Sequence, residues 1–399
     1  MSEWKECKLD DVAGVQTGPF GSQLHNKDYV EYGTPIITVE HLGNRKISRQ
    51  NLPCVSDKDK ARLVKYSLEY GDLVFSRVGS VDRCSFVSKD EHGWLFSGRC
   101  LRVRSDNTIM DNNFLYYYFC TETIKETVRR IAVGATMPSI NTELLSNLII
   151  QFPPLPEQKA IASVLSSLDD KIDLLHRQNK TLEAMAEILF RQWFVEEADE
   201  DWEEGIINQL VSIQNGFAFK SSDFKENGIN GVIKIKNISG GIIDIDNTDF
   251  VENSVIQDID NRFKIRTGDI LIAMTGAEIG KLGIIPNTNK GLWLNQRVGM
   301  LKEKFKGAKY LAYLQLKSEF GQDYIENTAT GSAQPNISSI GIENCNFPIS
   351  NSSFVKNCAL QIDEFYYKVI FNLGQIRTLE KLRNTLLPKL MSGGVRVTV

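Results

Sequence analysis

The segment Phe152–Trp193 reads FPPLPEQKAIASVLSSLDDKIDLLHRQNKTLEAMAEILFRQW, and its apolar residues recur in steps that alternate between four and three. This spacing is a heptad pattern, which is typical of a helix that packs along a second helix. Pro156 suits the start of such a helix, and the polar Asn179 interrupts its apolar stripe. The stripe comprises Ile161, Leu165, Leu168, Ile172, Leu175, Leu182, Ala186, Leu189 and Trp193.

A second heptad segment lies 197 positions further along the chain. Asn372 and Arg383 interrupt its stripe, Gly374 lies inside it, and Pro388 stands where the helix is expected to end. The residues before it, 347–353, lack the Pro-Glu-Gln of the first copy. We therefore expect a second helix that is less stable and less continuous than the first. Its apolar members are Cys358, Ile362, Phe365, Val369, Ile376, Leu379, Leu386 and Leu390.

The rest of the chain repeats at the same offset. Gly71-Asp72-Leu73-Val74 recurs as Gly268-Asp269-Ile270-Leu271, and the segment 134–140 recurs as 331–337, in both cases 197 positions later. An offset close to half of the 399 residues indicates that one unit has been duplicated.

Each copy has the pattern of a mixed α/β domain. Short β-rich runs follow glycine turns, and longer apolar and aromatic runs follow them in the order expected of helices. The expected strands are 35–39, 72–76, 232–235 and 269–273, and the expected helix cores are 114–119 and 310–314.

The two core asparagines indicate how the heptad helices pair. Centred antiparallel helices place Asn179 opposite Asn372, whereas parallel helices place each of them opposite an apolar residue. Because a buried unpaired amide costs roughly 1–3 kcal/mol, the antiparallel arrangement is favoured. The sequence thus predicts an α+β fold in which two α/β domains are joined by two long helices forming an antiparallel coiled coil, with an internal pseudo-two-fold duplication. The alternative, that each asparagine faces solvent on an imperfect seam, stays open.

Composition and charge restrict the class of protein. No apolar run approaches the ~18 residues of a membrane span, and the start Met1–Lys5 lacks a signal-peptide pattern, so we expect a cytoplasmic protein without membrane contact. The net charge of −4 argues against nucleic-acid binding unless a local basic surface or a cationic partner compensates. The seven cysteines form no Cys-x-x-Cys pair and do not cluster with the four histidines, so we expect core thiols rather than disulfides or a metal site.

At this point the motifs resemble those of the specificity subunits of type I restriction-modification enzymes. The residues that carry the resemblance are the Phe-Pro-Pro-Leu-Pro-Glu-Gln stretch at 152–158, the segment 329–338, the Gly18–Ser22 turn and the helix segment 169–172. The resemblance extends over essentially the whole chain. It implies target-recognition domains at 1–153 and 200–350, a central conserved helix at 154–199 and a C-terminal conserved helix at 351–399.

The resemblance also implies a function. Each target-recognition domain would read one half of a bipartite site in double-stranded DNA, and the coiled coil would set the spacer and dock two methyltransferase (M) subunits. Restriction-motor (R) subunits would join for cleavage. The chain would bind no cofactor or metal itself, because S-adenosylmethionine, ATP and Mg are expected on the partner subunits.

The sequence contains no complete catalytic motif, which indicates a non-catalytic chain. Gly276–Leu282 resembles a phosphate-binding loop, but it has one residue too few between its glycines, and Leu282 stands where a magnesium-binding Ser or Thr belongs. Pro153-Pro154 follows Phe152 and leads into a helix, unlike the Asn/Asp-Pro-Pro-aromatic loop of amino-methyltransferases. No Asp…Glu-x-Lys nuclease pattern stands out in either copy.

The best candidates for DNA contact are loops rich in Arg, Lys, Asn, Gln and hydroxyl side chains, which reach base edges and phosphates. Four loop pairs match between the copies. The candidates in these loops are Arg77, Ser80, Arg83, Arg99, Thr136, Lys220, Thr275, Lys281, Gln296, Arg297, Gln334 and Asn336. The alternative for the glycines and prolines shared by both copies is that they shape turns, and Arg99 and Arg297 could each hold a carboxylate inside the domain.

Two other functions compete with DNA recognition. A protein-binding scaffold with two gripping domains is consistent with the acidic pI near 5.8. A single-chain modification enzyme is opposed by the missing cofactor motif.

Overall fold

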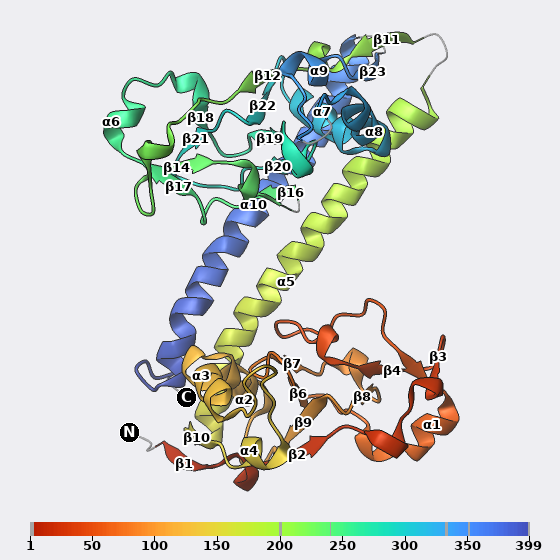
Figure 1. The fold of residues 1–399 in the computed structure, drawn as a ribbon, viewed down its shortest axis with the longest axis vertical. Helices are drawn as coiled ribbons and strands as arrows, with labels where there is room; N and C mark the ends of the chain where they lie inside the picture. Colours follow the sequence, from red (N-terminus) through yellow and green to blue (C-terminus); the bar gives the residue numbers. More distant parts are fainter. Residues whose placement is uncertain (1–3, 199–201, 240, 332–333, 350–351, 398–399) are drawn as a thin grey trace. The chain divides into compact units, whose positions relative to one another are not determined.

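The computed structural model describes residues 4–198, 202–239, 241–331, 334–349 and 352–397. The chain divides into two compact units: unit 1 comprises residues 1–170 and 380–399, and unit 2 comprises residues 171–379. Two long helices, α5 (Leu155–Arg191) and α10 (Ser352–Met391), contribute one segment to each unit (Figure 1). The two predicted heptad helices are therefore confirmed.

Within the described residues, unit 1 contains two four-stranded sheets and a two-stranded ladder. Their strand orders are β2-β9-β6-β7, β3-β5-β4-β8 and β1-β10. The strands are β1 (Lys5–Lys8), β2 (Ala13–Thr17), β3 (Tyr29–Val30), β4 (Thr34–Ile37), β5 (Cys54–Val55), β6 (Leu73–Ser76), β7 (Cys84–Phe86), β8 (Leu95–Phe96), β9 (Cys100–Ser105) and β10 (Ile149–Phe152). The helices besides the long pair are α1 (Asp57–Arg62), α2 (Asn112–Cys120), α3 (Glu122–Ile131) and α4 (Thr142–Ser146).

Unit 2 repeats this plan with larger sheets. Their strand orders, among the described residues, are β12-β22-β19-β20-β16-β15, β13-β17-β14-β21-β18 and β11-β23. The strands are β11 (Glu203–Ile206), β12 (Val211–Asn215), β13 (Phe224–Lys225), β14 (Asn230–Ile233), β15 (Ile238–Ser239), β16 (Gly241–Ile243), β17 (Asp249–Val251), β18 (Lys264–Ile265), β19 (Ile270–Ala273), β20 (Leu282–Ile284), β21 (Gly291–Leu294), β22 (Val298–Glu303) and β23 (Asn346–Ile349). The helices are α6 (Asn253–Ile256), α7 (Ala308–Lys317), α8 (Glu319–Thr328) and α9 (Ser339–Glu343).

Strand register confirms the duplication. In unit 1, Val74 pairs with Arg102 and Ser76 with Cys100, while in unit 2 Leu271 pairs with Met300 and Ala273 with Val298. Because a shift of one residue would turn every side chain to the opposite face, this shared register places equivalent side chains on the same face of the sheet in both units. The expected strands and helix cores are confirmed as β4, β6, β14, β19, α2 and α7. Their ends differ from the expected ones by two residues or fewer, except that α7 ends three residues later.

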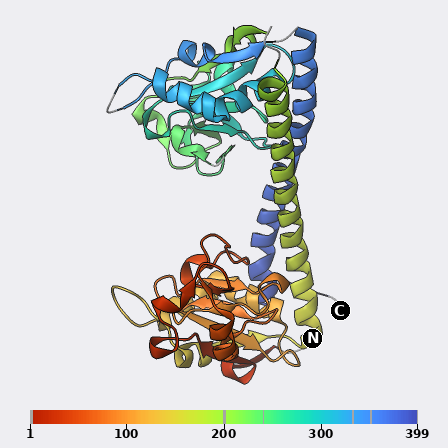
Figure 2. The same cartoon turned by 90° about the vertical axis from the view of Figure 1, so that its right-hand side faces the viewer.

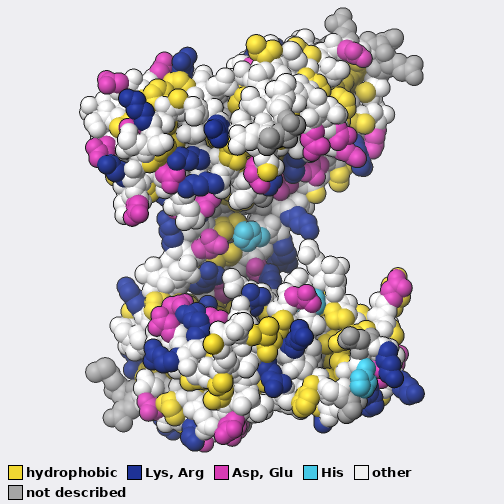
Figure 3. All heavy atoms as spheres, in the orientation of Figure 1, with side chains coloured by type: hydrophobic (Ala, Val, Ile, Leu, Met, Phe, Trp, Pro, Cys, Tyr) yellow, Lys and Arg dark blue, Asp and Glu magenta, His cyan; other side chains and the backbone are white. Residues whose placement is uncertain are grey.

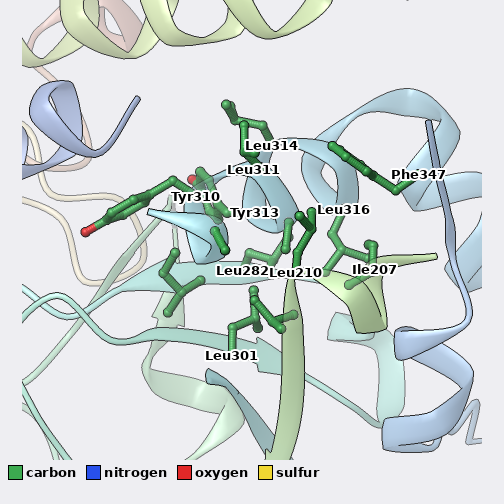
Figure 4. Packing of buried hydrophobic residues seen from close by; sticks show 14 of the residues in the cluster. Ile207, Leu210, Leu282, Leu301, Tyr310, Leu311, Tyr313, Leu314, Leu316 and Phe347 are labelled. Atoms are coloured by element: carbon green, nitrogen blue, oxygen red, sulfur yellow. The ribbon is translucent and has the colours of Figure 1, made fainter. Parts of the chain in front are cut away.

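The core of unit 2 lies between its larger sheet and the helices α7 and α10 (Figure 4). Leu282 and Leu301 reach it from the sheet, and Leu311 and Leu314 reach it from α7. The rings of Tyr310 on α7 and Tyr366 on α10 stack with centroids 4.6 Å apart and planes 3° from parallel. The long helix is thus part of the domain core and is not merely attached to it.

The segments of α5 and α10 in unit 2 pack antiparallel. The Asn372 amide donates to Asn179 Oδ1 at 2.8 Å, and the ring of Phe194 contacts the ring of Phe354. Phe194 follows Asn179 in the chain whereas Phe354 precedes Asn372, so the two segments run in opposite directions. Both asparagines are buried beside Ile172, Leu175, Val369, Leu373 and Ile376. The predicted facing of the two asparagines is confirmed, and the solvent-facing alternative is wrong.

The second helix differs from expectation in its continuity, while its end agrees with the position of Pro388. It is continuous through Gly374, where a Cβ atom would lie 2.8 Å from the Cβ of Asn287, so the glycine permits close packing of α10 against that neighbouring segment. It ends at Met391, three residues after Pro388, and Leu390 and Met391 are buried in the core of unit 1. The proline stands in the last turn, where only one backbone hydrogen bond is lost.

The cysteines are structural. Cys84, Cys100, Cys345 and Cys358 are buried, and all seven are free thiols. Burial raises the pKa of Cys100 to about 12 and the pKa values of Cys345 and Cys358 to about 11. These thiols therefore stay protonated near neutral pH, as expected of core residues.

None of the helices in the described part of the chain combines the length and the hydropathy that a bilayer crossing requires.

Candidate nucleic-acid interface

The four candidate loops of unit 2 lie side by side. The Phe217 amide donates to Leu294, and the Gln296 amide donates back to Phe217 at 2.9 Å. The Met274 amide donates to the Arg297 carbonyl at 3.1 Å and so joins the 274–281 loop to the 295–297 loop. The Gly276 amide donates to the Pro335 carbonyl at 2.9 Å and so joins the 274–281 loop to the 330–337 segment. We call residues 216–222, 274–281, 295–297 and 330–337 the unit 2 loop cluster.

Unit 1 holds its loops with equivalent hydrogen bonds. The Arg77 amide donates to the Arg99 carbonyl at 2.9 Å, and the Gly79 amide donates to Pro138 at 2.8 Å. The Ile140 amide donates to the Arg77 carbonyl at 2.9 Å, and Gly18 donates to Cys100. We call residues 18–23, 77–83, 97–99 and 133–139 the unit 1 loop cluster. Figure 2 shows each unit from a second side, together with the segments of α5 and α10 that belong to it.

Glycines make these junctions possible. A Cβ atom on Gly18 would lie 2.2 Å from the Ser97 carbonyl oxygen, and one on Gly216 would lie 2.1 Å from that of Asn295. Gly134 and Gly331 adopt φ values of 112° and 96°, in the region that other residues rarely occupy. The glycines shared by both copies thus have a backbone role, which agrees with the turn-shaping alternative.

Candidate side chains of unit 1 differ in exposure. Arg83 and Arg99 are exposed, and neither guanidinium has a hydrogen-bond or ion-pair partner among the residues that the structure describes. Ser80 and Thr136 are also exposed. Arg77 is half-buried and donates to the Gly98 carbonyl at 3.2 Å, so it braces the loops from within. The possibility that Arg99 holds a carboxylate inside the domain is not what the structure shows.

In unit 2 the candidate residues that are exposed are Lys220, Lys281, Gln296, Arg297, Gln334 and Asn336. Lys281 forms an ion pair with Glu278, which offsets part of its charge. Thr275 is half-buried and forms a β-bridge with Asn336. Arg297 has no carboxylate partner within the described residues, so its guanidinium is available to a ligand.

Both loop clusters carry local positive charge. The unit 1 cluster contains three arginines and one aspartate, and the unit 2 cluster contains two lysines, one arginine and one glutamate, so each has a formal charge of +2. The chain as a whole carries −4, and acidic and basic side chains alternate over the face of each unit seen in Figure 3. The objection from net charge therefore does not apply to the loops themselves.

Several residues that brace the clusters were missed from the sequence. Arg129 on α3 donates to Asp82 at 2.6 Å and holds the 79–83 turn, and in unit 2 the Gln322 amide donates to the Gly280 carbonyl at 3.2 Å. These partners lie more than 40 positions apart in the chain, so no local pattern could have indicated them. Exposed Phe20 and Met137 lie in candidate loops and exposed Val133 lies beside one, but none of them was among the candidate contacts, which were polar or charged.

Arg383, the polar exception of the second heptad segment, has a structural partner. It donates to Asp169 Oδ1 at 2.7 Å, and Tyr117 donates to Asp169 Oδ2 at 2.6 Å. Burial and the bond to Asp169 both raise the pKa of Tyr117. This group of side chains joins α2, α5 and α10 inside unit 1 and has no role in the loop cluster.

Comparisons with known proteins agree with this geometry. Residues 1–184 and 199–378 match the family described as "Type I restriction modification DNA specificity domain". The chain is similar to the type I restriction enzyme MjaVIII specificity subunit of Methanocaldococcus jannaschii, with 28% identity over 323 residues that cover 76% of this chain and 75% of that protein. It is also similar to the EcoBI specificity subunit of Escherichia coli, with 25% identity over 316 residues that cover 71% of this chain and 62% of that one. The fold is similar to that in a crystal structure of a type I restriction-modification system S subunit from M. genitalium, with a TM-score of 0.68 and 18% identity over 98% of this chain and 96% of that one.

The chain belongs to the family of type I restriction-modification specificity subunits. Its role is that of the DNA specificity subunit of a type I complex, itself non-catalytic. Family membership favours DNA recognition over the scaffold and the single-chain modification enzyme.

Proposed function

We propose that the two loop clusters each read one half of a bipartite DNA site. The observation that supports this most strongly is the repetition of one charged loop cluster, held by equivalent backbone hydrogen bonds, in both units. Two similar surfaces with different side chains suit two short DNA sequences that differ from one another. Residues 1–153 and 200–350 are the proposed target-recognition domains, with conserved helices at 154–199 and 351–399.

The long helices are proposed to set the spacer between the halves. Helix α5 has 37 residues, which corresponds to about 56 Å at ~1.5 Å per residue. Half-sites about one duplex turn apart lie about 34 Å from centre to centre, so a helix of this length is sufficient to act as a ruler. Inserting four residues into α5 should lengthen the preferred spacer, and an unchanged spacer would contradict this part of the proposal.

The same helices are proposed to dock two methyltransferase subunits, with restriction-motor subunits completing the complex in the cytoplasm. A groove of about 870 Å³ lies beside α5 in unit 2 and is lined mainly by apolar side chains. Ile188, Val195 and Phe320 on its walls are more than half exposed, which is typical of a protein-binding surface. S-adenosylmethionine, ATP and Mg would be bound by these partners, and partner cations would add to DNA affinity.

Selection from a pool of random DNA duplexes tests the central proposal. The full chain, alone and together with the methyltransferase subunit, should enrich one sequence made of two fixed halves and an unspecified spacer. Enrichment of a single continuous sequence, or of none in either condition, would contradict it.

A further inference from the structure

The two loop clusters differ in chemistry at three equivalent positions. The unit 1 cluster carries Phe20, Val133 and Met137, which are 59%, 64% and 65% exposed. The same positions in the unit 2 cluster carry Ala218, Thr330 and Gln334, all exposed.

The backbone establishes that these positions are equivalent. A β-bridge joins Val133 to Ser139 in one loop and Thr330 to Asn336 in the other. A Cβ atom on Gly134 would approach the Met137 carbonyl oxygen at 2.6 Å, and one on Gly331 would approach that of Gln334 at 2.9 Å. Because the equivalent bridge forms between the polar residues Thr330 and Asn336 in unit 2, the apolar side chains of unit 1 are not required for this bridge.

The apolar side chains of unit 1 lie among cations. Phe20 packs against Gly98, the residue before Arg99, since a Cβ atom on Gly98 would lie 2.8 Å from the Cβ of Phe20. The hydrogen bond from Gly79 to Pro138 holds Met137 beside the turn that carries Arg83. The unit 1 cluster thus combines exposed apolar side chains with Arg83 and Arg99, whose guanidiniums have no partner among the described residues. This combination suits a ligand with methyl groups in a groove bordered by phosphates, which describes the major groove at A·T pairs.

We infer that the unit 1 cluster reads its half-site through contact of Met137 and Val133 with thymine methyl groups, and that Gln334 in unit 2 reads adenine. The inference rests on the proposed function and specifies the bases read by each cluster. In the major groove the thymine C5-methyl is the apolar feature, and adenine N6 and N7 form a donor–acceptor pair that matches a side-chain amide. Arg83 and Arg99 bind the flanking phosphates.

The test removes single groups from the DNA. The half-site of unit 1 is first identified as the half that changes when residues 1–150 are exchanged for those of a relative. Each thymine in it is then replaced by deoxyuridine, which lacks only the methyl group, and affinity is measured with the full chain and the methyltransferase subunit. At one position or more the Kd should rise about fourfold, as expected for one buried methyl group. In Met137→Gln the effect should be lost at one or more of these positions, whereas any position that Val133 contacts should stay sensitive.

A matched experiment addresses unit 2. Replacing adenines of its half-site by 7-deazaadenine removes the N7 acceptor and should weaken binding of the parent chain at least about fivefold at one position, but not binding of Gln334→Met. Thermal unfolding of both variants should equal that of the parent, because both side chains are exposed.

Three results would overturn the inference while leaving the proposed function standing. They are a unit 1 half-site without an A·T pair, deoxyuridine replacement without effect at every position, and equal sensitivity of the parent and Met137→Gln. If Met137→Gln lost methyltransferase binding while its DNA affinity stayed unchanged, Met137 would instead contact a protein partner. This result would also overturn the inference. Absence of any enriched split sequence would overturn the proposed function, and this inference with it.

Discussion

The asparagine pair between α5 and α10 allows a quantitative prediction for Asn372→Leu. Asn179 and Asn372 are 6% and 0% exposed, and Asn372 Nδ2 donates a 2.8 Å hydrogen bond to Asn179 Oδ1. Asn179 Nδ2 and Asn372 Oδ1 already lack a partner among the described residues. Removing the Asn372 side chain therefore also orphans Asn179 Oδ1.

The magnitude follows from what remains buried. A lost hydrogen bond that leaves an unsatisfied group costs about 1–3 kcal/mol, so Asn372→Leu and Asn179→Leu should each be destabilised by about that amount. The double variant has no buried amide at this position, and replacing both partners by apolar groups is nearly neutral or stabilising. It should be at least as stable as the parent, with a coupling free energy of roughly 2 kcal/mol or more.

Urea unfolding of the full chain, followed by helical circular dichroism, measures this coupling in a double-mutant cycle. The midpoints of the two single variants should fall and that of the double variant should recover. Additive losses in the double variant would refute the reasoning, because they would mean that the two amides do not interact.

Three further predictions concern single side chains. Burial acts to raise the pKa of Asp246, but hydrogen bonds from Arg377 and Lys290 outweigh it and lower the pKa to about 2, below the usual 3.8. The resulting stabilisation is present above pH ~4 and is lost progressively as pH falls through about 2, the pKa of Asp246 in the folded chain. Asp246→Asn should therefore be less stable than the parent at pH 6 by thermal unfolding, and the difference should shrink as pH is lowered towards 2. The same difference at both pH values would contradict this. Gly216→Ala places a Cβ atom 2.1 Å from the Asn295 carbonyl oxygen and should lower stability by about 1–3 kcal/mol in urea unfolding, whereas Gly14→Ala, which meets nothing within 4 Å, is the matched control. Arg83→Ala should weaken DNA binding at low salt and reduce the slope of log K against log salt by about 1 without changing the sequence preference, and a changed preference would assign Arg83 to a base edge.

The sequence predicted the parts of the fold that repeat. The heptad steps gave both long helices, and the positions of Asn179 and Asn372 gave their direction, because period and polarity are local properties of the chain. The matched loops were also predicted, since the offset of 197 aligned Gly134 with Gly331.

Contacts between distant residues could not be predicted in this way. Arg383 looked like a defect of the heptad stripe until its bond to Asp169, 214 positions away, was visible. Gly374 looked like a break in α10, yet it is the close approach of Asn287 that requires a small residue there. The sequence made Arg77 a candidate contact by residue type but could not indicate its bond to the Gly98 carbonyl, because that partner lies 21 positions away. The remaining candidate contacts stay predictions.

The proposal that each unit reads one half of the target is tested most directly by exchanging residues 1–150 for those of a relative and sequencing the methylated bases produced by the assembled enzyme. We expect one half of the methylated site to change while the other half and the spacer are kept. A change in both halves, or in neither, would contradict the assignment of one half to each unit.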